Sequence, residues 1–439
     1  QKIKWQALDK VFKEIDWISE NKVEFVYNAD SNFGLLPDHL EVTKYLVGKK
    51  KETGYPVGHR CDWAKNKADK VIELAKLFYD ANMDKGITIA LQSMNPDTLK
   101  AIRRKNVDDG KLEQFLKMYN DWDLPSYVEL ILGLPEETYD SFINGVSQVM
   151  ELDQHNYIGI YPLTAFPNTP FGDPEYIKKY ELDIVDTYTA FMHYDISEQN
   201  DFERETMIVG TRTMNREEYK KAYYFRWMVM YGHYLGVVQF ISRFLRVHSN
   251  VTYEKFYNTL LNYSYENPDS FLGNELKETI KAIEGVIAVE QPWGRILNDV
   301  KENFAWDFEE ATAIRIVQNK DLFYSEIKEF LNKHFPIQEE VMEELFKYQD
   351  CAVLDPTLSY PRKEKFSFNI HDVISKKAPL SKKDCELEFT AYNGNLYEWG
   401  KIVLWWGRRV GACKTKIKHV DEVLDNKFDL VHRGTLRDQ

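Results

Sequence analysis

The chain has 439 residues, of which 44% are hydrophobic, and its formal net charge is -13. This length allows two or three domains, each with a full hydrophobic core. The acidic balance argues against a general nucleic-acid-binding protein, because such proteins display clustered Lys and Arg side chains.

The first 215 residues alternate between two hydrophobic patterns. Runs rich in apolar, β-branched and aromatic residues predict strands at residues 23–30, 55–61, 86–93, 128–132, 156–162 and 205–210. Apolar residues at helical spacing predict helices at residues 7–21, 40–47, 67–81, 111–120 and 139–152, and a short helix that starts at Pro96. This alternation, at about 30 residues per unit, predicts right-handed crossovers and therefore a parallel sheet or barrel.

The pattern changes twice along the rest of the chain. It is helical and rich in Tyr, Phe and Glu up to about residue 355, and short strand patterns return after it. We therefore expect three regions: 1–215, 216–355 and 356–439, the last a small α+β region with hairpins. The most apolar stretch, from Trp227 to Phe240, is too short and too polar to cross a bilayer. It predicts a buried helix.

The sequence contains no familiar metal or nucleophile motif. Its cysteines are widely spaced: Cys61, Cys351, Cys385 and Cys413. Since no CxxC pair or His/Cys cluster occurs, we expect no zinc site, and this sparse use of cysteine is typical of a reducing cytoplasm. HExxH, a P-loop and GxSxG are also absent, so hydrolase and kinase functions lack support. The aromatic segment with Arg226 and His233 is more typical of a core than of a cofactor site.

The segment VELILGLPEET, residues 128–138, predicts a buried strand, a tight turn and the start of a helix. Ligands of α/β sheets bind at the carboxyl ends of such strands. Gly133 allows the backbone to approach a ligand because it has no Cβ. Glu136 and Glu137 fall where the first turn of a helix favours anionic side chains. A single corner of this kind is also compatible with a purely structural turn.

Polar side chains follow two other predicted strands. Asp30 and Asn32 could hold an ammonium or hydroxyl group, or could cap the next helix. Gln92 and Ser93 could bond a ribose, and Arg104 could hold a carboxylate. The structural alternative for this second group is a strand end, an ordinary helix cap and a solvated basic helix end.

Five segments, in this order, resemble the radical SAM superfamily, and most closely its branch with an N-terminal cobalamin-binding domain. The segments are residues 14–34, 63–67, 90–106, 129–142 and 161–171. The resemblance implies an α/β fold, namely a partial (β/α)6 TIM-like barrel. It also implies a 4Fe-4S cluster that reduces and cleaves S-adenosylmethionine, so that the resulting radical abstracts hydrogen from a substrate.

The resemblance assigns cofactor-binding residues to the strand ends. They are Asp30, Asn32, Gln92, Ser93, Arg104, Glu129, Ile131 and Gly133. The first two match the segment that binds the methionine amino group, and the next two match the strand end that faces ribose and methionine. The arginine, with Arg103 beside it, matches the carboxylate contact, and the last three lie on the strand whose backbone edge contacts adenine.

Two features depart from the family pattern. The CxxxCxxC loop that ligates the cluster is absent, and the widely spaced cysteines cannot supply that set of thiolates. We therefore expect a truncated chain that lacks the cobalamin domain, the first barrel strand and the cluster loop. The turn also has Glu136 where the family usually has glycine.

The expected function is that of a radical SAM enzyme fragment, inactive alone, whose parent performs cobalamin-assisted methyl transfer or another radical rearrangement. We expect an electron donor such as flavodoxin or ferredoxin, a small-molecule or peptidyl substrate, a cytoplasmic location, and neither nucleic-acid nor membrane binding. One alternative is a degenerate barrel that acts as a binding module. Another is an unrelated α/β-barrel enzyme that uses Asp30, Lys65 and Glu129 as acid–base groups.

Overall fold

The computed structural model describes residues 6–64, 68–84, 86–106, 109–122, 124–189, 193–198, 203–391, 395–400 and 414–420. The chain divides into two compact units. Unit 1 comprises Gln1–Ala90, Asn106–Val128 and Leu424–Gln439. Unit 2 comprises Leu91–Lys105 and Glu129–Val423. The boundary therefore falls within two of the strands that the sequence predicts.

Unit 1 contains a parallel pair of strands, β1 (Phe25–Phe33) and β2 (Gly58–Trp63). Its helices are α1 (Leu8–Glu20), α2 (His39–Thr53), α3 (Ala68–Asp80) and α5 (Asp109–Asp121). The buried face of α3 supplies Val71 and Phe78 to the core, where they pack with residues of both strands. The parallel pairing and the crossover helix between the two strands confirm the βαβ pattern predicted for this part of the sequence.

A second sheet has the strand order β3-β4-β5, which is also their order along the chain. The strands are β3 (Ile87–Gln92), β4 (Ser126–Leu132) and β5 (Tyr157–Pro162). Helix α4 (Pro96–Ala101) follows β3 and α6 (Tyr139–Glu151) follows β4. The side chain of Asn95 caps α4 by accepting a hydrogen bond from the Asp97 N–H, at 2.9 Å.

The predicted strand at residues 205–210 forms, but its partner differs from the expectation. It is β8 (Arg204–Gly210), and it pairs antiparallel with β6 (Asp183–Tyr188), which follows the short helix α7 (Pro174–Tyr180). Among the described residues the strands form sheets of two or three strands, and none of these sheets closes into a barrel. The mixed α/β class is confirmed.

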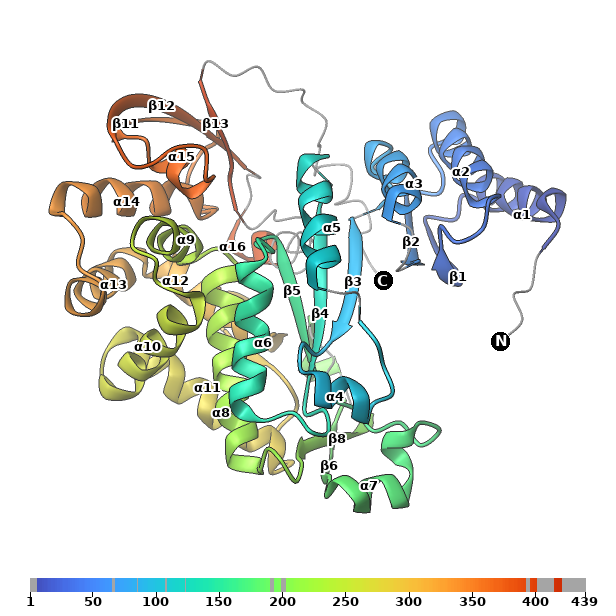
Figure 1. The fold of residues 1–439 in the computed structure, drawn as a ribbon, viewed down its shortest axis with the longest axis horizontal. Helices are drawn as coiled ribbons and strands as arrows, with labels where there is room; N and C mark the ends of the chain where they lie inside the picture. Colours follow the sequence, from blue (N-terminus) through green and yellow to red (C-terminus); the bar gives the residue numbers. More distant parts are fainter. Residues whose placement is uncertain are drawn as a thin grey trace. The chain divides into compact units, whose positions relative to one another are not determined.

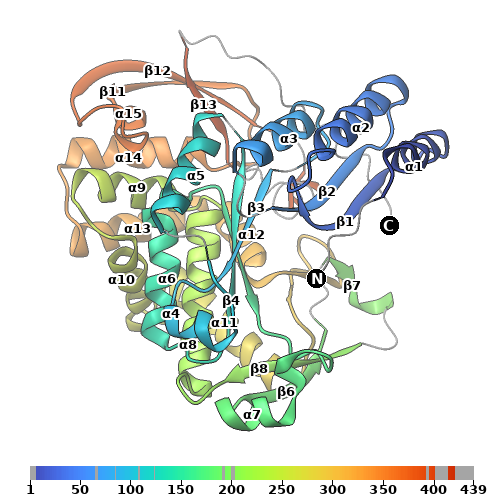
Figure 2. The same ribbon diagram turned by 45° about the vertical axis from the view of Figure 1, so that its right-hand side comes forward.

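Helices make up most of the rest of unit 2. They are α8 (Arg216–Val229), α9 (Gln239–His248), α10 (Tyr253–Glu266), α11 (Phe271–Ile287), α12 (Phe308–Gln318), α13 (Lys320–His334) and α14 (Glu339–Ala352). Helix α8 packs against α6, α10, α11 and α12, and both views show α6 and α8 side by side (Figures 1 and 2). Because it is surrounded, its residues from Ala222 to Val229 are all buried.

Short strands complete unit 2. β7 (Tyr194–Asp195), β10 (Phe304–Trp306) and β9 (Arg295–Ile296) form one antiparallel sheet. β11 (Arg362–Phe368), β12 (Lys382–Thr390) and β13 (Lys416–His419) form another, near the short helices α15 (Ile370–Ile374) and α16 (Leu396–Trp399) in the chain. The prediction of hairpins in this region stays a prediction, and residues 392–394 and 401–413 lie outside the described residues.

The apolar stretch from Trp227 to Phe240 is buried throughout, as predicted. It is not one regular helix, because a π-helical turn over Met230–Tyr234 separates α8 from the segment that leads to α9. Within the described part of the chain, no helix is long and apolar enough to span a membrane. The predicted region boundaries near 215 and 355 stay predictions.

Candidate functional site

The part of the sheet that lies in unit 2 has one face less covered than the other. On β4, Leu130 and Leu132 are buried, whereas Glu129 and Ile131 are half-buried. Successive side chains of a strand point to opposite faces, so Glu129 and Ile131 share the less covered face. Tyr161, at the end of β5, is 40% exposed. We use the name open face for three side chains of β4 and β5 that are not fully buried, namely Glu129, Ile131 and Tyr161.

The ends of β3 and β4 both leave the sheet in a left-handed conformation. Gln92 has φ +69°, Gly133 has φ +100° and Glu136 has φ +64°. For residues with a Cβ this conformation costs about 1–2 kcal/mol. Strained backbone of this kind concentrates at binding and catalytic sites, which makes the two strand ends candidates for a site.

Gly133 is required by the packing of this chain. A Cβ added there would lie 3.1 Å from the Ile208 carbonyl oxygen and 3.3 Å from the Tyr219 ring. The side of Gly133 on which that Cβ would project is therefore filled by protein, and the positive φ also favours glycine. The predicted approach of a ligand to this backbone stays a prediction.

Ser93 and Glu137 hold the ends of β3 and β4 together. Ser93 is 4% exposed and Glu137 is 2% exposed, and the Ser93 hydroxyl donates to one carboxylate oxygen of Glu137. The Ser141 hydroxyl donates to the other carboxylate oxygen at 2.5 Å. Burial raises the pKa of Glu137, and these hydroxyl donors counteract the shift. Glu137 is thus a buried structural acceptor.

The expectation that Glu136 and Glu137 lie in the first turn of a helix is wrong. Helix α6 begins at Tyr139 with Thr138 as its N-cap, so both glutamates precede it. Glu136 points outward and forms an ion pair with Arg212, while its neighbour turns into the protein. The left-handed φ of Glu136 accounts for the glycine that the family usually has at this position.

Arg104 and Glu129, both assigned to the cofactor site, interact electrostatically. Arg104 is half-buried after α4, and its backbone N–H donates to the Leu99 carbonyl at 2.8 Å. Burial lowers the pKa of the Arg104 guanidinium, and the Glu129 carboxylate partly opposes this effect. A cation and an anion therefore lie near each other at this strand end, whereas Arg103 is exposed.

Asp30 and Asn32 belong to unit 1. One Asp30 carboxylate oxygen accepts the Asn32 backbone N–H at 2.9 Å, and the other lies 3.2 Å from Nε2 of His39. The Asn28 side chain accepts the Asp30 backbone N–H at 3.0 Å. These Asx contacts lie within β1 and do not cap the next helix, because the N-cap of α2 is Asp38. Lys65 and Asn66 lie outside the described residues.

Arg226 and His233 are core residues, as the sequence predicted. The Arg226 guanidinium donates to the Ile160 carbonyl at 2.6 Å and forms a buried ion pair with Glu309 at 3.1 Å. The His233 ring lies between Tyr257 and His155, at 2.9 Å and 3.0 Å. Both side chains are therefore held by contacts within unit 2.

Sequence reasoning missed Tyr161 and Glu137. Tyr161 lies in a segment that carried the family resemblance, and its ring covers Gly159, where an added Cβ would lie 2.8 Å away. The pairing of a tyrosine with a glycine two residues earlier on one strand face was the available signal. No sequence signal separates Glu137 from Glu136, since their opposite directions follow from the backbone turn.

The described cysteines do not form a ligand set for an iron–sulfur cluster. Cys61 lies in unit 1, Cys351 and Cys385 lie in unit 2, and all three are free thiols. A 4Fe-4S cluster requires several thiolates around one position. The described part of the chain does not provide them, and Cys413 lies outside it.

Two curated proteins are similar to this chain over most of its length. TokK, a cobalamin-dependent radical SAM methyltransferase of Streptomyces tokunonensis, is 29% identical over 386 residues, which cover 83% of this chain and 55% of TokK. A 2-(S-pantetheinyl)-carbapenam-3-carboxylate methyltransferase of Streptantibioticus cattleyicolor is 28% identical over 361 residues, which cover 79% of this chain and 53% of that enzyme. The chain thus spans about half the length of these relatives. No protein-family model matches it.

Solved structures of radical SAM proteins show partial likeness. TsrM of Kitasatospora setae, a radical S-adenosylmethionine methyltransferase, gives a TM-score of 0.33 at 16% identity, covering 49% of this chain and 45% of TsrM. Coproporphyrinogen III oxidase (HemN) of Escherichia coli gives a TM-score of 0.29 at 16% identity, covering 36% of this chain and 37% of HemN. The sequence relatives extend well past residue 215, where the recognisable motifs end. The chain is therefore a relative of the cobalamin-dependent radical SAM methyltransferases.

Proposed function

We propose that this chain forms the S-adenosylmethionine-binding part of a cobalamin-dependent radical SAM methyltransferase. The observation that carries the proposal is the similarity to TokK, which extends over 83% of the chain. The strained strand ends and the open face in unit 2 support it, because α/β enzymes bind ligands at the carboxyl ends of their strands. Under this proposal β1 to β5 are strands of a partial radical SAM barrel.

The side chains of the open face, together with Gln92 and Arg104, suit a zwitterionic cofactor. Glu129 and Gln92 supply an anion and an amide, and Arg104 supplies a cation for a carboxylate. Ile131 and Tyr161 supply apolar and aromatic surface of the kind that accommodates an adenine ring. When bound, S-adenosylmethionine supplies the reactive methyl and adenosyl groups. The residues of this chain bind the cofactor, orient it and exclude water.

Ser93 acts in this proposal as a positioning residue. Its hydroxyl hydrogen is committed to Glu137, so it holds the end of β3 and thereby the backbone at Gln92. Asp30 and Asn32 are proposed contacts of the methionine amino group. The 4Fe-4S cluster, cobalamin, the electron donor and the methylated substrate are proposed for the whole protein, and no residue of this chain is assigned to them.

Titration of the purified chain with S-adenosylmethionine, followed by isothermal calorimetry, tests the assignment. We expect saturable binding of one cofactor per chain, weakened about tenfold or more by Arg104→Gln because a charged hydrogen bond to the carboxylate is lost. Arg315→Gln is the matched control, since Arg315 makes an exposed ion pair with Asp299 at 2.9 Å in the same unit. Equal binding by both variants, or no binding by the folded chain, would contradict the assignment.

A further inference from the structure

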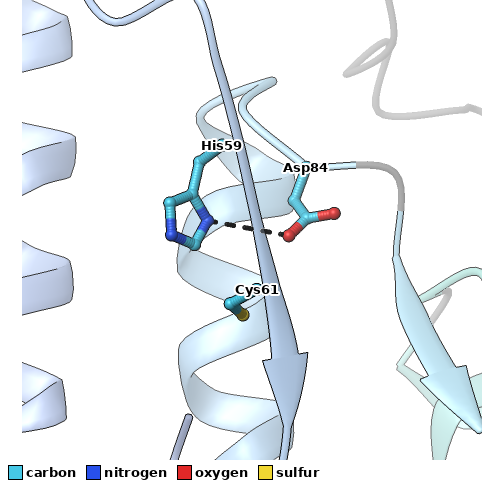
Figure 3. Close-up of side chains that lie close together, drawn as sticks. All are labelled: His59, Cys61 and Asp84. Atoms are coloured by element: carbon cyan, nitrogen blue, oxygen red, sulfur yellow. Dashed lines mark ion pairs between the residues drawn. The ribbon is translucent and has the colours of Figure 1, made fainter. Parts of the chain in front are cut away.

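Three side chains that can bind a metal ion meet in the core of unit 1 (Figure 3). His59 and Cys61 are alternate residues of β2, so they project from the same face of the strand. Asp84 approaches them from the segment between α3 and β3. The candidate ligand atoms all lie within 4.8 Å of one another, and all three residues are buried.

His59 presents an unsatisfied nitrogen to this cluster. Its side chain is 1% exposed, and Nδ1 has no hydrogen-bond partner among the described residues. Nδ1 lies 3.8 Å from Oδ2 of Asp84, which is too long for a hydrogen bond. The ring cannot easily turn away, because it stacks on Phe78 with centroids 4.1 Å apart and an interplanar angle of 16°. A buried polar atom without a partner is unfavourable, because it has lost its hydrogen bonds to water and gained none in the protein.

The charges around Cys61 favour a cation. Burial raises the pKa of the Cys61 thiol, and the carboxylates of Asp84 and Asp62 raise it further. The thiol is therefore protonated when nothing else is bound. A divalent cation would displace this proton and neutralise the negative charge that the thiolate and Asp84 then carry.

We propose that His59, Cys61 and Asp84 bind one zinc ion. A histidine nitrogen, a thiolate and a carboxylate are the ligands that zinc prefers, and three protein ligands leave a fourth position for water. In a tetrahedral zinc site the nitrogen and oxygen ligands are about 3.4 Å apart, so the 3.8 Å between His59 and Asp84 needs to shorten by only a few tenths of an ångström. The Cys61 sulfur, which lies within 4.8 Å of the other two ligand atoms, would approach them as well.

The ion would join β2 to the segment that leads from α3 into β3. It would therefore stabilise unit 1 without contributing to methyl transfer. The proposal departs from the sequence expectation of no zinc site, because the ligands come from alternate strand positions and a distant loop and not from a CxxC motif. It is independent of the proposed function.

The test is metal binding by the purified 439-residue chain. The chain is stripped with a chelator, dialysed against zinc, and analysed for metal by plasma mass spectrometry. A parallel sample is loaded with cobalt, whose thiolate-to-metal charge-transfer band reports a bound cysteine. We expect about one zinc ion per wild-type chain, a cobalt–thiolate band, and a higher unfolding temperature with zinc than without.

Cys61→Ser, His59→Gln and Cys351→Ser are compared with the wild type. Cys351 is the matched control, because it is also a free cysteine with 2% exposure but lies in unit 2. We expect Cys351→Ser to retain the zinc and the cobalt band, and Cys61→Ser to lose the band. His59→Gln is the second variant, which keeps the proposal testable if Cys61→Ser fails to fold, and we expect it to bind less zinc than the wild type. A wild-type spectrum without the thiolate band, or a thiolate band that folded Cys61→Ser keeps, would overturn the proposal.

Discussion

The Ser93 hydroxyl donates a hydrogen bond to the Glu137 carboxylate, and this buried contact fixes the end of β3 against the turn that follows β4. Gln92, which directly precedes Ser93, and Gly133, which begins the turn that leads to Glu137, are both assigned to the cofactor site. The geometry of the proposed site therefore depends on a contact that itself binds no cofactor.

Replacing Ser93 by alanine leaves one buried oxygen of Glu137 without its donor. We expect Ser93→Ala to lower the free energy of unfolding by about 1–3 kcal/mol, which is the usual loss when a buried polar group is left unsatisfied. Urea unfolding of the variant, monitored by circular dichroism, measures the change. Ser249→Ala is the control, because Ser249 is exposed at the end of α9. Equal stability of the two variants would show that the Ser93 contact contributes nothing.

Glu136 tests the cost of the left-handed turn. Both Glu136→Gly and Glu136→Ala remove the ion pair with Arg212, but only glycine relieves the strain at φ +64°. We expect the glycine variant to be the more stable of the two by about 1 kcal/mol.

The same comparison at Glu175, in the first turn of α7, provides the control. There we expect alanine to be the more stable residue, because glycine weakens a helix. Thermal unfolding of the four variants gives both differences. If alanine is more stable than glycine at position 136 as well as at position 175, the account of the turn is contradicted.

Gly133→Ala introduces a Cβ where the chain has no room for it. The positive φ and the contact of 3.1 Å with the Ile208 carbonyl oxygen both oppose the substitution. We expect a loss of about 1–3 kcal/mol in stability. Gly48→Ala, in the middle of α2 with nothing within 4 Å of the added Cβ, should instead gain about 0.5–1 kcal/mol. Denaturant unfolding that shows no loss for Gly133→Ala would mean that the turn adapts.

Local pattern was enough to predict much of the fold. The apolar run that ends at Gly133 and the Asn95-Pro96 start of α4 are signals contained within a few residues, and both elements form where expected. The partner of β8 could not be predicted in this way. Its pairing with β6 brings together residues about 20 positions apart, and no periodicity specifies whether a strand joins a sheet in parallel or antiparallel fashion.

The sequence predicted only part of the candidate site. The resemblance assigned Glu129 and Arg104 to the site, and in the structure the Glu129 carboxylate acts to raise the pKa of the Arg104 guanidinium. It could not show that Ser93 is committed to Glu137, because that contact joins residues 44 positions apart. The cluster of His59, Cys61 and Asp84 escaped notice for the same reason.

His155 makes stability sensitive to acid. Burial is the main cause that lowers its pKa to about 3, far below the usual 6.5, and its ring contacts Asp153 and His233. Below pH 6.5 the unfolded chain binds a proton that the folded chain does not bind, so stability is full above pH 6.5 and falls as the pH drops toward 3. The loss amounts to a few kcal/mol in order of magnitude.

Urea unfolding at a series of pH values between 7 and about 4 measures this effect. We expect His155→Gln to lose stability less steeply with acidification than the wild type, because one proton fewer is taken up on unfolding. His248 is exposed, so we expect the stability of His248→Gln to fall with pH more nearly as steeply as that of the wild type. A wild-type stability that does not change across this range would contradict the assignment of a buried neutral histidine.

The most direct test of the central claim is turnover of S-adenosylmethionine by the anaerobically purified whole protein. After reduction, S-adenosylhomocysteine and 5′-deoxyadenosine are quantified for the wild type and for Arg104→Gln. We predict about four irons per protein, bound cobalamin, formation of these products by the wild type, and a markedly lower rate for the variant. A protein that carries its cluster and cobalamin but leaves S-adenosylmethionine unchanged would contradict the claim.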